Sequence, residues 1–169
     1  MLSMRRFTIR EKIGSYVLPG LFVLAWIFTL TNMAPPGGAA GESTALNAVH
    51  WLLYMAGFVF LFSSVMHSVF AKSMAKSIGW QTNGFQYELA AVSLGLGIGC
   101  FYANANGHTA WIAISIPVIS FLFLAGVNHV IEMVRKKNFA PNNTLVLIWD
   151  FGMSISLLAL LPTMIHATA

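Results

Sequence analysis

The sequence predicts an all-α membrane protein with five transmembrane helices, and two observations carry this prediction. The chain of 169 residues is 57% hydrophobic and only 8% charged, which is too few charged groups to cover a water-soluble surface. Several apolar runs also approach or exceed the roughly 20 residues with which a helix crosses the hydrocarbon layer of a bilayer. We therefore expect a single integral membrane domain over residues 1–169, with the lipid bilayer as its surroundings.

The predicted spans are the apolar runs between turn residues and basic residues. They cover approximately residues 16–33, 46–70, 85–102, 109–134 and 145–166. A basic segment precedes the first run, and the loop of residues 35–38, which reads Pro-Pro-Gly-Gly, follows it. Ser43 or Thr44 is expected to cap the second span, which Lys72 and Lys76 close.

The later spans carry their own packing and turn signals. A polar turn over residues 77–84 leads into the third span, where Ala91, Gly95 and Gly99 stand at four-residue steps. Such a ridge of small residues lets a neighbouring helix approach closely. Pro117 is expected to bend the fourth span, because proline removes a helical hydrogen bond.

The basic residues predict the orientation of the chain. All nine Lys and Arg fall in the N-terminal segment, in the turn after the second span or in the turn after the fourth, where the run 135–137 ends that span. Asn143 or Thr144 is expected to cap the fifth span. The positive-inside rule then places the N-terminus in the cytoplasm and the C-terminus outside, in a bacterial inner membrane. The basic residues serve as topology signals that attract anionic lipid, and no nucleic-acid partner is expected.

Five ionisable residues lie inside the predicted spans, at similar depth: His67, Glu88, His129, Glu132 and Asp150. Charged side chains inside a membrane are costly and usually face a bundle interior or a water-filled cavity. At 1.5 Å per residue, all five lie within about 10 Å of the cytoplasmic helix ends. We expect them to meet in a ligand or proton pocket that opens toward the cytoplasm.

The spacing of two histidine and acid pairs predicts the architecture. His67 and Glu88 are 21 positions apart, and so are His129 and Asp150. Both histidine-bearing spans would run inward and both acid-bearing spans outward. Spans two to five would then form a four-helix bundle of two parallel-related hairpins, to which the N-terminal span is added.

The chemistry of the pocket leaves several functions open. Imidazole and carboxylate groups from several helices suit a non-haem metal, for which the candidate ligands are His67, Glu88, His129 and Asp150, with Glu132 as an outer partner. His67 and His129 could instead be the axial ligands of a haem. A quinone head group, or protons passed along the histidines and carboxylates, would also suit the pocket. A hydrogen-bonded network that only fixes helix register remains the simplest alternative.

The leading functional hypothesis is a redox process at a bound metal, haem or quinone-type ligand. The first alternative is a non-catalytic membrane subunit, which would pack against a partner protein or a second copy of this chain through Gly95 and Gly99. The second is a proton-coupled permease for small solutes. The sequence contains no nucleophile elbow, phosphate loop, CxxC pair or HExxH motif, so hydrolase and kinase activities have no support and enzymatic activity is left open.

Short motifs resemble those of DoxX-like proteins and their small multi-pass bacterial relatives. The motifs are Gly79-Trp80, the run 85–88 of sequence Phe-Gln-Tyr-Glu, the glycines that follow it, and the run 138–141 of sequence Asn-Phe-Ala-Pro. The resemblance covers about residues 46–161 and implies a four-helix membrane bundle, in some members linked to sulfur or thiol oxidation and quinone reduction. Two departures are the additional N-terminal span and Cys100 as the only thiol, which does not support a dithiol relay.

Overall fold

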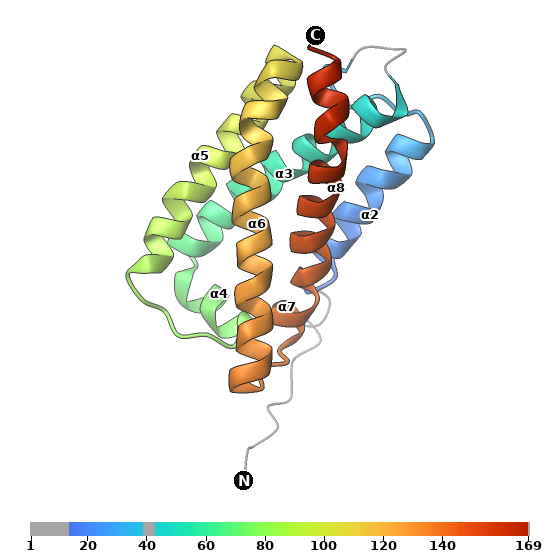
Figure 1. Ribbon diagram of the computed structural model, residues 1–169. Coiled ribbons are helices and arrows are strands. Elements are labelled where there is room, and N and C mark those ends of the chain that lie inside the picture. Colours follow the sequence, from blue (N-terminus) through green and yellow to red (C-terminus); the bar gives the residue numbers. More distant parts are fainter. Residues whose placement is uncertain (1–13, 39–42, 169) are drawn as a thin grey trace.

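The computed structural model describes residues 14–38 and 43–168, and within these ranges the chain is helical without strands (Figure 1). The helices are α2 (Val17–Leu30), α3 (Thr44–Ser68), α4 (Ala71–Ile78), α5 (Phe85–Asn106), α6 (His108–Lys136), α7 (Pro141–Thr144) and α8 (Val146–His166). The expected all-α fold is thereby confirmed.

Four helical segments are long and apolar enough to cross a membrane. They are α3, α5, α6 and the combined α7 and α8 segment Pro141–His166. The 22 residues of α5, for example, extend about 33 Å at 1.5 Å per residue, which matches a hydrocarbon layer of about 30 Å. The second to fifth predicted spans correspond to these four segments.

The first predicted span needs correction. Instead of residues 16–33, α2 has only 14 residues, or about 21 Å of helix. The helix stops early because Asn32 adopts a left-handed conformation, with φ of 54°, which a continuing helix does not allow. Within residues 14–38 and 43–168, the five predicted spans thus correspond to four long apolar helices and one shorter helix.

The region after α3 also differs from the prediction. Ser43 caps α3 as expected, since its Oγ accepts a hydrogen bond from the backbone N–H of Leu46 at 3.3 Å. The residues expected to close the span instead form the separate helix α4, in which Ala71, Ala75 and Ile78 are buried. Lys72 on its other side is exposed. This amphipathic pattern explains why a short helix lies beside the main helices.

The helices pack in neighbouring pairs. The most extensive packing joins α3 to α5 and α6 to α8, while α5 also contacts α6, and α2 contacts both α3 and α8. In Figure 1, α3 and α6 run toward the end where α4 and α7 lie, and α5 and α8 run away from it. Leu52, Leu53, Met153 and Leu157 are among the core side chains that these contacts bury completely or almost completely.

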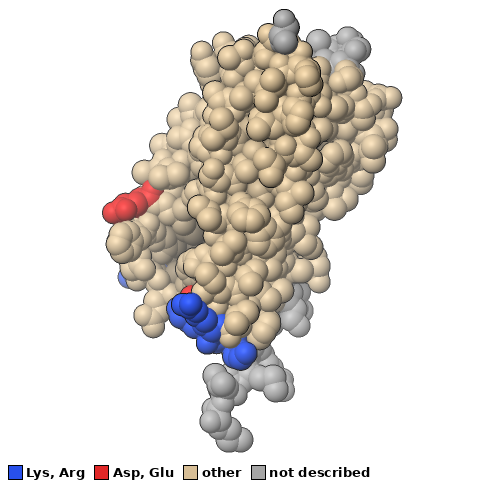
Figure 2. All heavy atoms as spheres, viewed as in Figure 1, with Lys and Arg blue, Asp and Glu red and all other residues tan. Residues whose placement is uncertain are grey.

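Large apolar side chains also cover the outside of the long helices. Exposed examples from different helices are Phe62, Ile98, Leu124 and Ile155. In Figure 2 most of the visible surface is free of charge, and the Lys and Arg side chains gather toward the end where α6 stops. An apolar surface of this extent is typical of a protein that contacts lipid.

Two glycines lie in the contact between α3 and α5. A Cβ atom on Gly97 of α5 would lie 2.9 Å from Cδ2 of Leu61 and 3.0 Å from its backbone nitrogen. A Cβ atom on Gly57 of α3 would lie 2.9 Å from the ring of Phe101. The backbone atom makes glycine necessary at position 97 for the observed packing, whereas a larger residue at position 57 would have to displace the Phe101 ring.

The predicted ridge of small residues does not make this contact. Ala91 and Gly95 are exposed, and a Cβ atom on Gly95 would have no neighbour within 4 Å. Only Gly99 lies against another helix, where a Cβ atom would be 2.6 Å from Cδ1 of Ile114. The ridge therefore lies on a different side of α5 from Gly97, and its proposed contact with a partner protein or second copy stays a prediction.

Two matched substitutions test this assignment. Gly97→Ala should destabilise the protein by about 1–3 kcal/mol, because the added methyl group overpacks the contact with Leu61. Gly95→Ala should be neutral or stabilise by about 0.5–1 kcal/mol, since it only improves helix propensity. Unfolding followed by circular dichroism in mixed micelles measures both. Equal effects of the two substitutions would contradict the packing described above.

Candidate functional site

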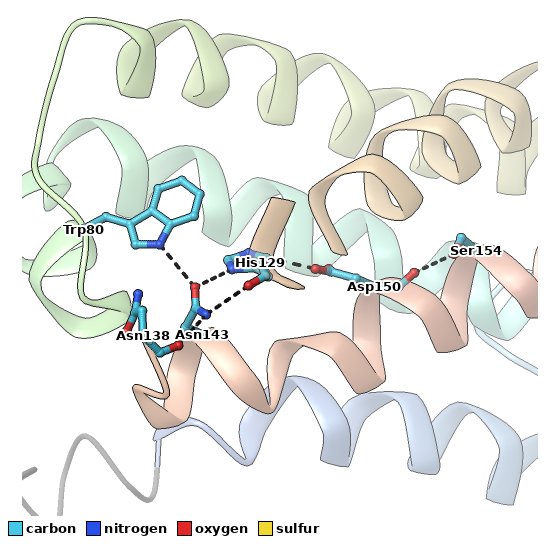
Figure 3. A network of polar contacts seen from close by, with 6 residues as sticks. All are labelled: Trp80, His129, Asn138, Asn143, Asp150 and Ser154. Carbon is cyan, nitrogen blue, oxygen red and sulfur yellow. Dashed lines mark hydrogen bonds and ion pairs between the residues drawn. The ribbon is translucent and has the colours of Figure 1, made fainter. Parts of the chain in front are cut away.

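A buried amide lies at the centre of a polar network where α6, α7 and the segment after α4 meet (Figure 3). Asn143 is 0% exposed, and its Oδ1 atom accepts hydrogen bonds from Trp80 Nε1 at 3.1 Å and from His129 Nδ1 at 2.8 Å. Its Nδ2 atom donates to the backbone oxygens of Asn138 at 3.1 Å and His129 at 3.4 Å. The side chain thus fills both its donor and its acceptor capacity.

These contacts determine which nitrogen of His129 carries a proton. The indole N–H of Trp80 is only a donor, so the Asn143 atom that it reaches must be the amide oxygen. The same oxygen faces His129 Nδ1, and that nitrogen must therefore be the donor. The other ring nitrogen, Nε2, is left for a different partner.

A buried carboxylate faces this second ring nitrogen. Asp150 is 3% exposed, and its Oδ2 atom lies 4.0 Å from His129 Nε2. This distance is too long for a direct hydrogen bond, and Oδ2 has no other hydrogen-bond partner among the described residues. An isolated ionised carboxylate is costly to bury. The arrangement is therefore suited to a proton held either by Asp150 or by His129 Nε2.

A glycine and a serine help to place Asp150. A Cβ atom on Gly126 of α6 would lie 3.2 Å from Cβ of Asp150 and 3.0 Å from the ring of Phe151, so glycine at this position lets α8 come close to α6. One turn along α8, the Ser154 hydroxyl donates to the backbone oxygen of Asp150 at 2.7 Å. Asp150 thus packs against α6 at Gly126, which lies about one helical turn before His129.

A connection between the end of α4 and the start of α7 covers the histidine. Gly79 ends α4 with φ of 77°, and a Cβ atom there would lie 2.6 Å from Oδ1 of Asn138. Asn138 Nδ2 donates to the backbone oxygen of Ile78 at 2.8 Å. The next residue, Trp80, has its ring 5.4 Å from the ring of His129, measured between centroids. The connection therefore holds an aromatic ring over the site.

The structure brings together only part of the predicted pocket. His129 and Asp150 face each other, while His67 accepts a hydrogen bond at Nδ1 from Gln86 Nε2 at 3.2 Å. Glu88 is exposed. Glu132 forms an ion pair with Lys136 at 2.7 Å, which is the interfacial pairing that the adjacent bases allow.

The expected set of metal ligands is not assembled in the described part of the chain. No group of three or more His, Cys, Asp and Glu side chains there is close enough to hold a metal ion. Residues at a similar depth along a membrane can still point in different directions around their helix axes. Gln86 and Glu88 are two residues apart and lie on different faces of α5, so the face that brings Gln86 to His67 turns Glu88 outward. This corrects the expected convergence of His67, Glu88, His129 and Asp150.

Sequence reasoning missed the two neutral side chains of the network. Asn143 was expected to cap the last span, but it lies in the short helix α7, and α8 begins at Val146 without a side-chain cap. Trp80 was expected to lie in a polar turn. The motifs Gly79-Trp80 and 138–141 could have pointed to the network, because Trp80 and Asn138 both form hydrogen bonds in it.

Substitution of Asn143 tests the network. Asn143→Ala should destabilise the protein by about 2–4 kcal/mol, since it leaves the buried donors of Trp80 and His129 without their acceptor. Asn142→Ala, at the neighbouring half-buried position, is the matched control and should change stability by less than about 0.5 kcal/mol. Thermal unfolding in lipid nanodiscs gives both values. A fully tolerated Asn143→Ala would show that the amide does not hold this end of the protein together.

Comparisons with known proteins place the chain in a family. A family model with the description "Family of unknown function (DUF6790)" matches residues 15–168. No curated protein and no solved structure gives a significant match. The family match provides no link to DoxX-like proteins, so that resemblance stays a prediction from the sequence. Because the match covers most of the chain, this protein belongs to the DUF6790 family of unknown function.

Proposed function

We propose that this protein is a multi-pass protein of the bacterial inner membrane in which His129 and Asp150 take up and release a proton. The observation that carries the proposal is the buried Asp150 Oδ2 atom, which has no hydrogen-bond partner in the described structure and lies 4.0 Å from His129 Nε2. Such intramembrane histidine and carboxylate pairs are typical of proton-handling sites.

The hydrogen bonds around the pair support this chemistry. Asn143 holds a proton on His129 Nδ1, so protonation can change only Nε2. A proton on Nε2 gives a cation opposite an anionic Asp150, whereas a proton on Asp150 leaves both side chains neutral. The two arrangements differ by a short movement of one proton. A proton-coupled step, such as small-solute permeation, could use the gain or loss of this proton.

The distribution of charge supports a position near the cytoplasmic surface. Among the described residues, Lys and Arg occur only in α4 and in the run 135–137, at the end where the network lies. The positive-inside rule assigns this end to the cytoplasm and the opposite end, with the C-terminus, to the outside. The other four basic residues, at positions 5, 6, 10 and 12, lie outside the described residues. The four long helices would form the bundle across the bilayer.

Infrared spectroscopy tests whether Asp150 changes its protonation. The difference spectrum between acidic and alkaline buffer, recorded in lipid nanodiscs, should contain the C=O band of a buried protonated carboxyl group. Asp150→Asn should remove this band because the amide cannot ionise. Glu88→Gln, which changes an exposed carboxylate, should leave it in place.

Two results would contradict proton binding by this pair. A band that persists in Asp150→Asn would assign the proton to another group. A spectrum of the unsubstituted protein without any titrating carboxyl band would show that Asp150 keeps one charge state throughout, and the network would then only fix helix register.

Binding of a redox ligand is the second candidate function, and the hydrogen bond at one ring nitrogen of His129 supports it. Histidines that bind a metal usually donate the N–H of the other ring nitrogen to an oxygen, as His129 does to Asn143. The non-haem metal and haem hypotheses could use His129 Nε2 in this way, and the quinone hypothesis could use it as a polar contact. Elemental analysis, the visible absorption spectrum and quinone extraction of the purified protein distinguish them. A stoichiometric metal or chromophore that is lost in His129→Gln would replace proton binding as the function.

A further inference from the structure

A second polar site lies at the corner between α3 and α4, apart from the network around Asn143. A cavity of about 300 Å³ opens there, lined by the chain from Ser68 to Ser73 and by Tyr87 of α5. Lys72 is exposed and forms no ion pair with any described residue. Lys72 is the one charged residue among the described residues that line the cavity.

The lining combines polar groups with an apolar edge. Ser73 is exposed beside Lys72, and Tyr87 adds a phenolic hydroxyl on a side chain that is 56% exposed. Val69 and Phe70, which also line the cavity, are 74% and 51% exposed. Hydroxyl and ammonium donors suit a phosphate group, while exposed apolar side chains next to them suit the fatty part of a lipid.

The position in the molecule agrees with this chemistry. The cavity lies at the end of the protein that carries the described Lys and Arg side chains, where α4 and the end of α6 are located (Figure 1). Anionic lipid head groups concentrate at the membrane surface that basic residues face. We propose that Lys72, Ser73 and Tyr87 bind the phosphate group of an anionic lipid in this cavity.

Lipid retention provides the test. The purified protein is exchanged into nanodiscs that contain phosphatidylcholine with a minor share of phosphatidylglycerol, and native mass spectrometry counts the phospholipids that stay bound. Phosphatidylglycerol should be retained in preference to phosphatidylcholine. Lys72→Gln should lower its retention roughly tenfold, because it removes a charge-assisted hydrogen bond to the phosphate. Ser73→Asp, which adds a negative charge to the cavity, should abolish the preference.

Arg135→Gln is the matched control, because it removes the same charge from an exposed position at the same end. It should lower phosphatidylglycerol retention much less than Lys72→Gln, because it removes only the general surface attraction. Equal losses in Lys72→Gln and Arg135→Gln would overturn the proposal, since they would reflect the general surface charge. Unchanged retention in Lys72→Gln and Ser73→Asp would overturn it as well. Both exposed positions are free of core contacts, and circular dichroism verifies that the variants are folded.

A soluble phosphate compound could present the same chemistry as the lipid. A second experiment therefore measures the binding of glycerol 1-phosphate to the protein in detergent. Suppose that glycerol 1-phosphate binds, that Lys72→Gln removes this binding, and that phosphatidylglycerol is not preferred. The phosphate site would then be supported, and its ligand would be a soluble phosphate compound in place of a lipid. Failure to bind either compound would exclude the phosphate site. The infrared test of Asp150 is independent of all these outcomes.

Discussion

The burial of Asn143 is the constraint on which the polar end of this protein depends. A primary amide in apolar surroundings must find partners for both its donors and its oxygen, or its burial becomes unfavourable. Here the partners come from three places in the chain: Trp80 after α4, His129 on α6, and Asn138 between α6 and α7. One side chain therefore joins segments that the hydrophobic effect alone would leave free to slide, since apolar contacts are not directional.

This constraint also gives the site its chemistry. Because His129 Nδ1–H donates its hydrogen bond to Asn143, only Nε2 can exchange a proton, and Nε2 lies 4.0 Å from the carboxylate of Asp150. Gly126 makes the pair possible, because a side chain there would push α8 away from α6. The separation leaves the pair close enough for charge interaction and too far apart for a hydrogen bond, so neither charge state is fixed by a direct contact.

The sequence predicts the helices of this fold better than it predicts the site. Long apolar runs must cover the thickness of a bilayer, so their ends are readable from length and polarity, and Ser43 was identified as a cap for the same local reasons. Which residues meet depends on rotation about each helix axis, which the weakly amphipathic membrane helices do not reveal. Glu88 was therefore expected to face His67, whereas Gln86 makes that contact.

The short helix α4 connects the two proposed sites. Its first residues, including Lys72, line the cavity, and the residue after its terminal glycine is Trp80, which lies over His129. Eight residues of helix separate these points by only about 12 Å, and a single helix of this length moves as one piece. A lipid bound at the start of α4 would restrain the helix and, with it, the ring that covers the histidine. The segment that the sequence predicted only as the close of a span and a polar turn is thus the element that would link the proposed lipid site to the buried pair.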